Sequence, residues 1–149
     1  MINRIAIAAA FLAAALLPVM VLAEMPEDPG VQCTYNGHWT YTDASEGGGP
    51  INWNLTEHSI CCGLWAIELQ GSGEDSYGTY SLSGECAEGQ CTVNQSYESG
   101  QLQGRHYQYT GEIEWEVPLD TMAGLKGSWG EKGKGTKGDF VIEEIQCGQ

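Results

Sequence analysis

Short stretches of alternating apolar and polar residues, separated by turn-forming residues, run through most of this chain. The alternation is clearest at residues 112–117 (EIEWEV), where each even position is acidic and each odd position is apolar. A repeat of two places successive side chains on opposite faces of a strand, whereas a helix needs a repeat near 3.6. Beyond residue 23, no stretch shows the helical repeat over a useful length. The sequence therefore predicts an all-β protein.

The alternation divides the chain into about eight strands, each with one apolar face. The residues expected on these faces are Tyr35, Trp39 and Tyr41; Ile51, Trp53 and Leu55; Trp65, Ile67 and Leu69; Tyr80 and Leu82; Val93 and Tyr97; Tyr107 and Tyr109; Leu125 and Trp129; and Phe140 and Ile142. Short turns between successive strands favour an up-and-down meander, and closing such a sheet removes its exposed edges. We predict a closed antiparallel β-barrel, with a β-sandwich as the alternative.

Glycines are placed where a small barrel needs them. All 21 glycines lie beyond residue 23. Glycine inside a strand marks a bulge or a sharp bend, and closed barrels use both to turn their corners. The glycines that fall inside predicted strands are Gly37, Gly63, Gly78, Gly84, Gly104 and Gly127.

Residues 1–23 have the layout of a secretory signal peptide. Arg4 precedes a short apolar run, and Val21-Leu22-Ala23 ends in the small residue that signal peptidase prefers. Pro18 breaks the run, which is shorter than the ~20 residues needed to span a bilayer, so a membrane anchor is disfavoured. We therefore expect the protein to be periplasmic or secreted.

The rest of the chain is expected to form a single domain. Residues 24–32 (EMPEDPGVQ) are acidic, rich in proline and poor in apolar residues, which is typical of a disordered lead-in. Residues 33–149 are of an ordinary length for one domain with one core. We assign the whole barrel to residues 33–149.

Six cysteines lie beyond the predicted cleavage site. An even number in a small exported domain indicates disulfides. Cys86 and Cys91 flank a four-residue loop that contains a glycine, so we predict a bridge across that hairpin. Two further cysteines, Cys61 and Cys62, are adjacent and would point to opposite faces of a strand. We expect them to pair with Cys33 and Cys147, in an order that the sequence leaves open.

No residue pattern predicts a metal site or a catalytic centre. His58, Cys61 and Cys62 offer ligand types that zinc or copper would accept, but thiols that form disulfides cannot bind a metal. The chain contains no G-x-S-x-G, no H-E-x-x-H and no phosphate-binding glycine loop. We therefore expect a protein that is not an enzyme and needs no cofactor.

The chain is strongly acidic. It carries 20 acidic and 6 basic residues, and cleavage after Ala23 would remove Arg4 and take the formal net charge from −14 to −15. Between Glu24 and Gly104 there is no Lys or Arg. Such a surface repels nucleic acid and anionic membranes, so neither is an expected partner. A cationic protein or a metal cation would suit it better, and solubility alone would also account for it.

The predicted apolar faces are unusually rich in Trp and Tyr. The chain has five Trp and seven Tyr but two Phe, of which Phe140 alone lies beyond residue 23. Trp and Tyr need polar partners when buried, whereas a core built for packing alone favours Phe, Leu and Ile. The functional interpretation is an aromatic-lined ligand site, and the alternative is a packed aromatic core. The candidate ligand-binding residues are Trp39, Trp53, Trp65, Tyr107, Tyr109, Trp115 and Trp129.

Two short segments carry a resemblance to known barrels. Gly127-Ser128-Trp129, followed after a glycine-rich turn by residues 138–142 (GDFVI), resembles the last hairpin of avidin-like and lipocalin-like barrels. Gly37-His38-Trp39 resembles their first strand. The resemblance implies an architecture and transfers no binding residues. It agrees with our first functional hypothesis, a non-enzymatic protein that holds a small apolar or sugar-like ligand.

A second resemblance points to a different class of function. Ser99-Gly100, followed by Arg105-His106-Tyr107, resembles the Ser-Gly and basic loop segments of bacterial lysozyme inhibitors, although the spacing departs from theirs. It implies an acidic protein-interaction module that inhibits a cationic secreted enzyme. A cavity inside the barrel would favour the ligand-binding hypothesis, and a completely filled interior would favour this one.

Overall fold

A computed structural model describes residues 29–60, 66–116 and 121–148 of the chain. The predicted signal peptide and most of the predicted lead-in lie outside these ranges. So do Cys61, Cys62, Gly63 and Trp65. Within the described ranges, no helix has the length and apolar character needed to cross a membrane.

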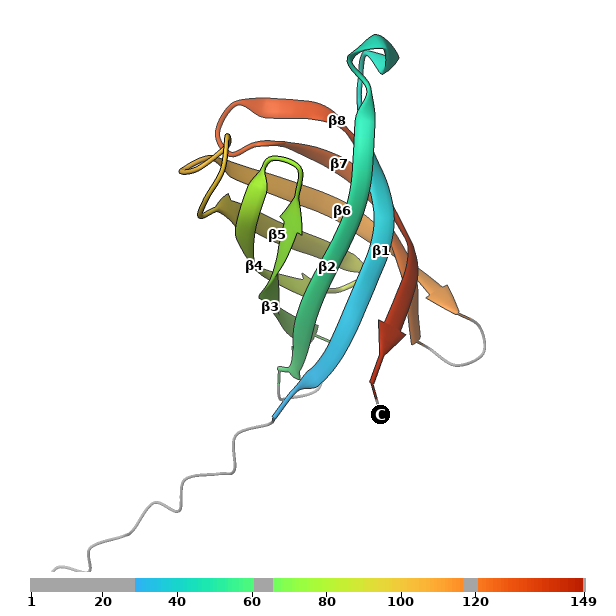
Figure 1. Ribbon diagram of the computed structural model, residues 1–149. Helices are drawn as coiled ribbons and strands as arrows, with labels where there is room; N and C mark the ends of the chain where they lie inside the picture. The colour runs from blue at the N-terminus through green and yellow to red at the C-terminus, as the bar shows by residue number, and fades with distance from the viewer. Residues whose placement is uncertain (1–28, 61–65, 117–120, 149) are drawn as a thin grey trace, which may run out of the picture.

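Eight strands make up the fold. They are β1 (Val31–Tyr41), β2 (Gly48–Ser59), β3 (Ala66–Asp75), β4 (Gly78–Ala87), β5 (Gln90–Tyr97), β6 (His106–Glu116), β7 (Thr121–Glu131) and β8 (Gly135–Cys147). Each strand pairs with the next in antiparallel fashion, and β8 returns to pair with β1, so the sheet closes on itself (Figure 1). The predicted up-and-down barrel is confirmed, and the β-sandwich alternative is wrong.

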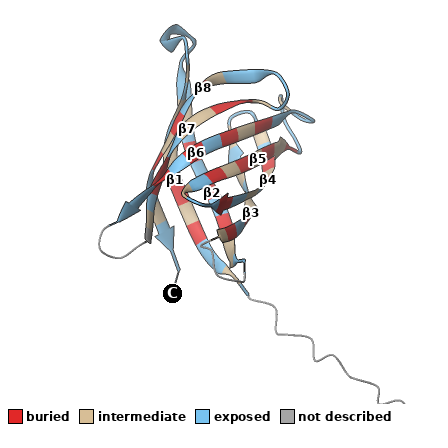
Figure 2. Ribbon diagram, turned by 180° about the vertical axis from the view of Figure 1, so that it is seen from behind, coloured by how far each residue is buried: buried red, intermediate tan, exposed pale blue. Residues whose placement is uncertain are grey.

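Alternating side chains fill the inside of the barrel. In β5, for example, the odd positions from Cys91 to Tyr97 are buried and the even ones are partly exposed, and the same banding recurs around the sheet (Figure 2). Closure explains this pattern, because the side chains on one face of every strand then point into a single interior. The residues that fill the centre include Tyr35, Trp53, Leu55, Leu69, Val93, Leu125 and Ile142.

Glycine is required where the backbone of one strand runs close to its neighbour. The register between β1 and β8 shifts at Asn36 and Gly37, which marks a bulge. A Cβ atom at Gly37 would collide with the carbonyl oxygen of Val141. The expected bulge at Gly37 is therefore present, and no other residue type fits there without a backbone shift.

The two ends of the barrel differ. The connections β1–β2, β3–β4, β5–β6 and β7–β8 gather at one end, which we call the mouth end. The chain enters β1 and leaves β8 at the opposite end (Figure 1). The β1–β2 hairpin, which carries the short 3₁₀ helix η1 (Ala44–Glu46), extends farthest beyond the mouth end (Figure 1). Strand β1 begins at Val31, two residues before the start expected for the domain.

Two disulfides link neighbouring strands. Cys86 bonds to Cys91 across the β4–β5 hairpin, as predicted. Cys33 bonds to Cys147, so the expectation that these two would pair with Cys61 and Cys62 is wrong. The physical reason is closure: β1 and β8 lie side by side, and Cys33 sits directly opposite Cys147 in their register.

We predict that the Cys33–Cys147 bridge contributes more stability than the hairpin bridge. It joins residues 114 apart in sequence, against 5 for Cys86–Cys91. The loss of loop-closure entropy gives about 5 kcal/mol for the long loop and about 2 kcal/mol for the short one. Urea denaturation of Cys33→Ala/Cys147→Ala and Cys86→Ala/Cys91→Ala would measure both values. Equal losses, or a greater loss for the hairpin variant, would contradict the prediction.

Candidate functional site

A cavity of about 110 Å³ opens at the mouth end of the barrel. Its lining comes from β1, β3, β5, β6 and β7 and from the β3–β4 and β5–β6 connections. The lining residues are Trp39, Tyr41, Asp75, Tyr77, Gln95, Tyr97, Leu102, Tyr107, Tyr109 and Trp129. Seven of these ten are Trp or Tyr, so aromatic surface dominates the site.

Five of the lining rings form a continuous group, which we call the aromatic collar: Trp39, Tyr41, Tyr97, Tyr107 and Trp129. Neighbouring ring centroids lie 5.1 to 6.0 Å apart, from Tyr97 through Tyr107 and Trp129 to Trp39 and Tyr41. The pairs are tilted or edge-to-face, which is the arrangement that aromatic quadrupoles prefer. The rings therefore hold one another in place around the cavity.

Glycines on adjacent strands make room for both indoles of the collar. Trp39 lies opposite Gly49 in β2, and Trp129 lies opposite Gly138 in β8. A Cβ atom at Gly49 would sit 3.0 Å from the Trp39 ring, and one at Gly138 would sit 2.8 Å from Trp129 Nε1. Trp129 Nε1 donates a hydrogen bond of 3.0 Å to the carbonyl oxygen of Thr40. The glycines and this bond fix the indoles against the barrel wall.

The floor of the cavity is polar, and the barrel beneath it is filled. Tyr109 donates its hydroxyl proton to Gln95 Oε1 over 2.9 Å, and Gln95 is only 3% exposed. Below them, the Trp53 ring packs edge-on against Tyr109 with centroids 5.0 Å apart. Among the described residues, every fully buried side-chain nitrogen or oxygen has a hydrogen-bond partner. In the part of the chain that the structure describes, buried side chains fill the barrel below the cavity.

Among the described residues that line the cavity, Asp75 is the one acidic or basic residue. Its Oδ2 accepts a hydrogen bond of 2.5 Å from the Tyr97 hydroxyl. Its Oδ1 accepts from the backbone N–H groups of Tyr77 (2.8 Å) and Gly78 (3.2 Å). The side chain therefore both shapes the β3–β4 turn and holds Tyr97, and its carboxylate is fixed in position at the wall of the cavity.

Burial and the carboxylate of Asp75 together keep the neighbouring tyrosines protonated. Burial raises the pKa of Tyr80 to about 12, and the charge of Asp75 adds to that rise. The same two causes raise the pKa of Tyr97, which also donates a hydrogen bond to Asp75. The pKa of Tyr109 is raised chiefly by burial, with smaller contributions from Tyr80 and Asp75. These hydroxyls therefore act as neutral donors and acceptors at ordinary pH.

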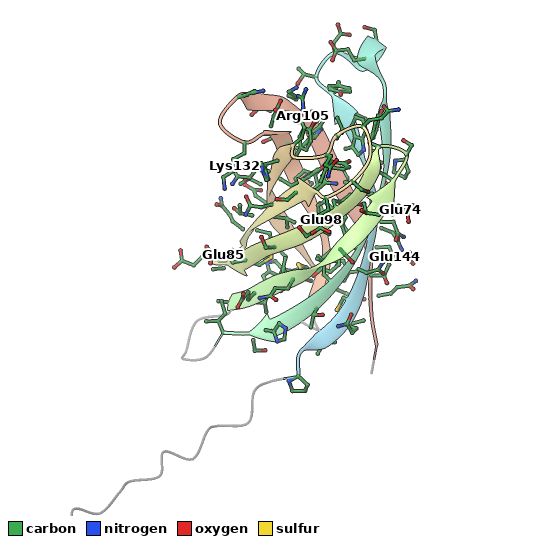
Figure 3. All side chains as sticks on the ribbon, turned by 60° about the vertical axis from the view of Figure 1, so that its left-hand side comes forward. Glu74, Glu85, Glu98, Arg105, Lys132 and Glu144 are labelled. Atoms are coloured by element: carbon green, nitrogen blue, oxygen red, sulfur yellow. A yellow bond between two sulfur atoms is a disulfide. The ribbon has the colours of Figure 1, made fainter. Side chains whose placement is uncertain are left out.

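Positive charge gathers on the rim of the mouth end, outside the cavity lining. Arg105, Lys134 and Lys137 reach the carboxylate of Glu131 over 3.3, 2.8 and 3.7 Å. The hydrogen bond from Lys134, together with the charges of Lys134, Arg105 and Lys137, holds the pKa of Glu131 below its usual range. Arg105 and Lys132 lie at the same end of the barrel in Figure 3. Three of the cations on this rim therefore form ion pairs with Glu131.

The predicted site residues separate into three groups. Trp39, Tyr107, Tyr109 and Trp129 line the cavity. Trp53 lies in the packed core under it, 1% exposed. Trp115 lies near the far end of β6 and is 39% exposed, so it has no place at the mouth, and Trp65 falls outside the described residues.

Sequence reasoning missed six lining residues: Tyr41, Asp75, Tyr77, Gln95, Tyr97 and Leu102. A signal was available for Gln95, because it is the polar residue on the inward face of β5, between Val93 and Tyr97. A polar residue at an inward position is expected to have a specific partner. Asp75, Tyr77 and Leu102 come from the ends and connections of strands, where alternation gives no information.

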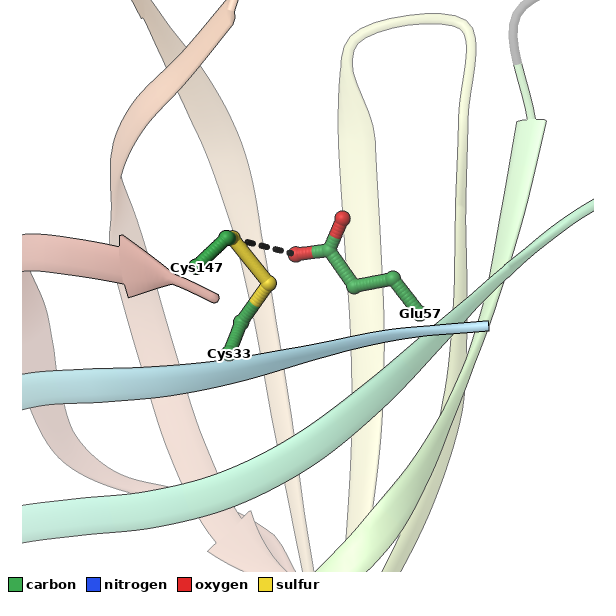
Figure 4. Close-up of side chains that lie close together, drawn as sticks. All are labelled: Cys33, Glu57 and Cys147. Carbon is green, nitrogen blue, oxygen red and sulfur yellow. Dashed lines mark hydrogen bonds between the residues drawn. A yellow bond between two sulfur atoms is a disulfide. The ribbon is translucent and has the colours of Figure 1, made fainter. Parts of the chain in front are cut away.

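One group of metal-ligand types occurs at the opposite end, but its chemistry does not suit a metal. Cys33, Cys147 and Glu57 lie close together, and within the described residues no other such group was found (Figure 4). Both sulfurs belong to one disulfide, so neither can be a thiolate ligand. Glu57 Oε1 accepts a hydrogen bond from the Tyr35 hydroxyl and lies 4.0 Å from Cys147 Sγ. Because that sulfur carries no proton, the two atoms are in contact but form no hydrogen bond.

Compared with protein families, curated proteins and solved structures, the chain matches none. The functional argument therefore depends on the geometry of the mouth.

We predict that the buried tyrosines make the fold sensitive to alkali. Five have a raised pKa in the folded state: Tyr35, Tyr80, Tyr97, Tyr107 and Tyr109. Above pH 10 the unfolded chain loses phenolic protons that the folded chain keeps, so the free energy of unfolding falls as pH rises. Each such tyrosine contributes a slope approaching about 1.4 kcal/mol per pH unit.

Urea denaturation and phenolate absorbance between about pH 9 and pH 11 would check this behaviour. Tyr80→Phe should lower the slope by the share of one tyrosine, over the interval from pH 10 to about 12. A folded protein in which every tyrosine ionises near pH 10 would show that the interior does not exclude phenolate.

Proposed function

We propose that this chain is an exported, non-enzymatic binding protein that holds a small ligand in the mouth cavity. The observation that carries the proposal is the change in packing along the barrel axis. Side chains fill the centre of the barrel, whereas the mouth retains a cavity lined by the five rings of the aromatic collar, which contact one another. Binding sites in small β-barrels characteristically open at the mouth and combine apolar walls with a few placed polar groups.

The size of the cavity limits what it can enclose. A volume of 110 Å³ corresponds to about three or four water molecules in the liquid and is well below the ~300 Å³ of a typical drug-sized site. The ligand is therefore a small molecule, or a larger one that inserts a single group. The available contacts are ring faces, tyrosine hydroxyls, the Gln95 amide and the Asp75 carboxylate.

The composition of the lining supports binding rather than chemistry. Covalent catalysis needs a nucleophile beside a base, and the lining contains no Ser, Thr, Cys, His or Lys. Its single carboxylate already accepts three hydrogen bonds, which suits a fixed recognition group better than a group that exchanges protons.

The acidic exterior keeps a second candidate in view, a protein-interaction module that binds a cationic protein. Exposed carboxylates occur on four of the eight strands, for example Glu68 on β3, Glu85 on β4 and Glu112 on β6. The lysozyme-inhibitor-like segment also lies at the mouth end. Its Ser99 hydroxyl lies 2.7 Å from Thr79 Oγ1 and accepts from the Thr79 N–H. Binding of this kind would weaken steeply as salt rises.

Tryptophan fluorescence with a panel of small probes tests the proposed function. The panel contains monosaccharides, phenol, indole and tetramethylammonium, and at least one probe should shift the emission. Trp39→Leu removes a half-buried collar ring and should weaken binding of that probe at least tenfold. Trp115→Leu, the matched control at the far end of the barrel, should leave it unchanged.

Two outcomes would contradict the proposal. In one, no probe changes the fluorescence of the protein or its nuclear magnetic resonance spectrum. In the other, a probe binds but both Trp variants lose it equally, which would place the site elsewhere. Salt-sensitive binding to lysozyme, with an unresponsive mouth, would favour the second candidate.

A further inference from the structure

We propose that the mouth cavity recognises an alkylammonium cation of about the size of a trimethylammonium group, with the charged centre facing Asp75 and the alkyl groups against the aromatic collar. This inference rests on the proposed function and names the chemical class of its ligand.

Asp75 carries a charge that no ion pair among the described residues compensates. Its three hydrogen-bond partners, the Tyr97 hydroxyl and two backbone N–H groups, are all neutral. Five ion pairs link the described residues, and none involves Asp75. A carboxylate has about four acceptor positions, so one remains for a ligand. A negative charge therefore stands at the cavity wall, and none of the described residues forms an ion pair with it.

Aromatic rings form most of the other walls of the cavity. The faces of Trp and Tyr rings attract cations, and several such rings around one site are the usual means of recognising quaternary ammonium groups. Seven of the ten lining residues are Trp or Tyr, contributed by four strands and one turn. A methylated ammonium group has an apolar surface around its charge, so it loses less free energy on leaving water than a primary ammonium does. Its charge suits the Asp75 carboxylate, and its methyl groups suit the aromatic rings.

The negative charge of Asp75 acts on the side chains around it. It contributes to the raised pKa of Tyr80, Tyr97 and Tyr109, and Tyr109 belongs to the floor of the cavity. At Tyr107, burial raises the pKa whereas the charge of Arg105 lowers it, so the negative potential is strongest on the Asp75 side of the cavity. On that side an anionic ligand would meet the potential unfavourably, whereas a cation would lower its energy by entering.

The basic rim at first sight would favour an anion. Arg105, Lys134 and Lys137 all pair with Glu131, and none of the three lines the cavity. Arg105 also acts on the lining residue Tyr107, through its charge and a side-chain hydrogen bond. Glu131 offsets part of this positive charge, and Asp75 remains the charged group of the described lining, so the ligand charge that suits the lining is positive.

The decisive test compares a cation with its neutral shape-match on the unmodified protein. Choline and 3,3-dimethylbutan-1-ol differ in one atom, a quaternary nitrogen in place of a carbon. Titration followed by tryptophan fluorescence and calorimetry should show choline binding at least tenfold more tightly. Tetramethylammonium should compete with choline, because it carries the recognised group alone.

Two charge-removing variants locate the effect. Asp75→Asn keeps an oxygen that can accept the turn hydrogen bonds but removes the charge, and it should weaken choline at least tenfold while changing the neutral alcohol by less than twofold. Glu74→Gln is the matched control, since Glu74 is the neighbouring exposed acid, labelled in Figure 3, and does not line the cavity. It should leave both affinities unchanged.

The outcomes separate this inference from the proposed function. Equal affinity for choline and the neutral alcohol, or tighter binding of the alcohol, would overturn the cation assignment while leaving a ligand site at the mouth. Binding of a sugar or phenol with no response to any ammonium probe would do the same. If no probe binds, both the cation assignment and the proposed function are wrong.

One further experiment distinguishes an ammonium group on a lipid from one on a dissolved molecule. Retention of the protein on phosphatidylcholine vesicles, reversed by choline, would assign the group to a lipid headgroup. Binding of free choline without retention would assign it to a dissolved ligand. Either result supports the recognised chemistry.

Discussion

The pairing of β1 with β8 is the contact on which the rest of the structure depends. It removes the two free edges of the sheet and turns eight apolar faces into one interior. Closure is secured at both ends of this seam. At one end Cys33 is bonded to Cys147, and at the other the Trp129 indole reaches across β8 at Gly138 to the carbonyl of Thr40. Trp129 also lines the cavity, so the β1–β8 seam and the site share this residue.

The cavity persists because of the kind of side chains that surround it. Below the mouth, aliphatic residues such as Leu55, Leu69 and Leu125 fill the gaps between rings. At the mouth the inward positions are aromatic rings that brace one another and cannot bend to fill a void. Rigid rings that cannot collapse leave a preformed space, and preformed space lowers the entropic cost of binding.

Sequence alternation was sufficient for the architecture but not for the site. It identified the inward faces, and with them four of the lining residues, namely Trp39, Tyr107, Tyr109 and Trp129. It could not place Trp115 correctly, because alternation gives the face of a strand and not the depth along the barrel axis. It could not find Asp75, which acts from the end of β3 through a turn. Pairing of Cys33 with Cys147 was likewise hidden, since it follows from closure between the ends of the chain.

The presence of aspartate rather than asparagine at position 75 requires an explanation beyond the turn. An asparagine could accept the N–H groups of the β3–β4 turn with its single oxygen, as Asp75 does with Oδ1. Its amide group would then face Tyr97 with a donor, and the tyrosine hydroxyl would accept a hydrogen bond instead of donating one. Aspartate adds a negative charge, in a chain whose formal net charge is already −14 and at a site walled by apolar rings. Both features make that charge unfavourable in the unliganded protein. A cation that enters the mouth would relieve both at once, so the charge of Asp75 is the strongest structural reason to expect a cationic ligand.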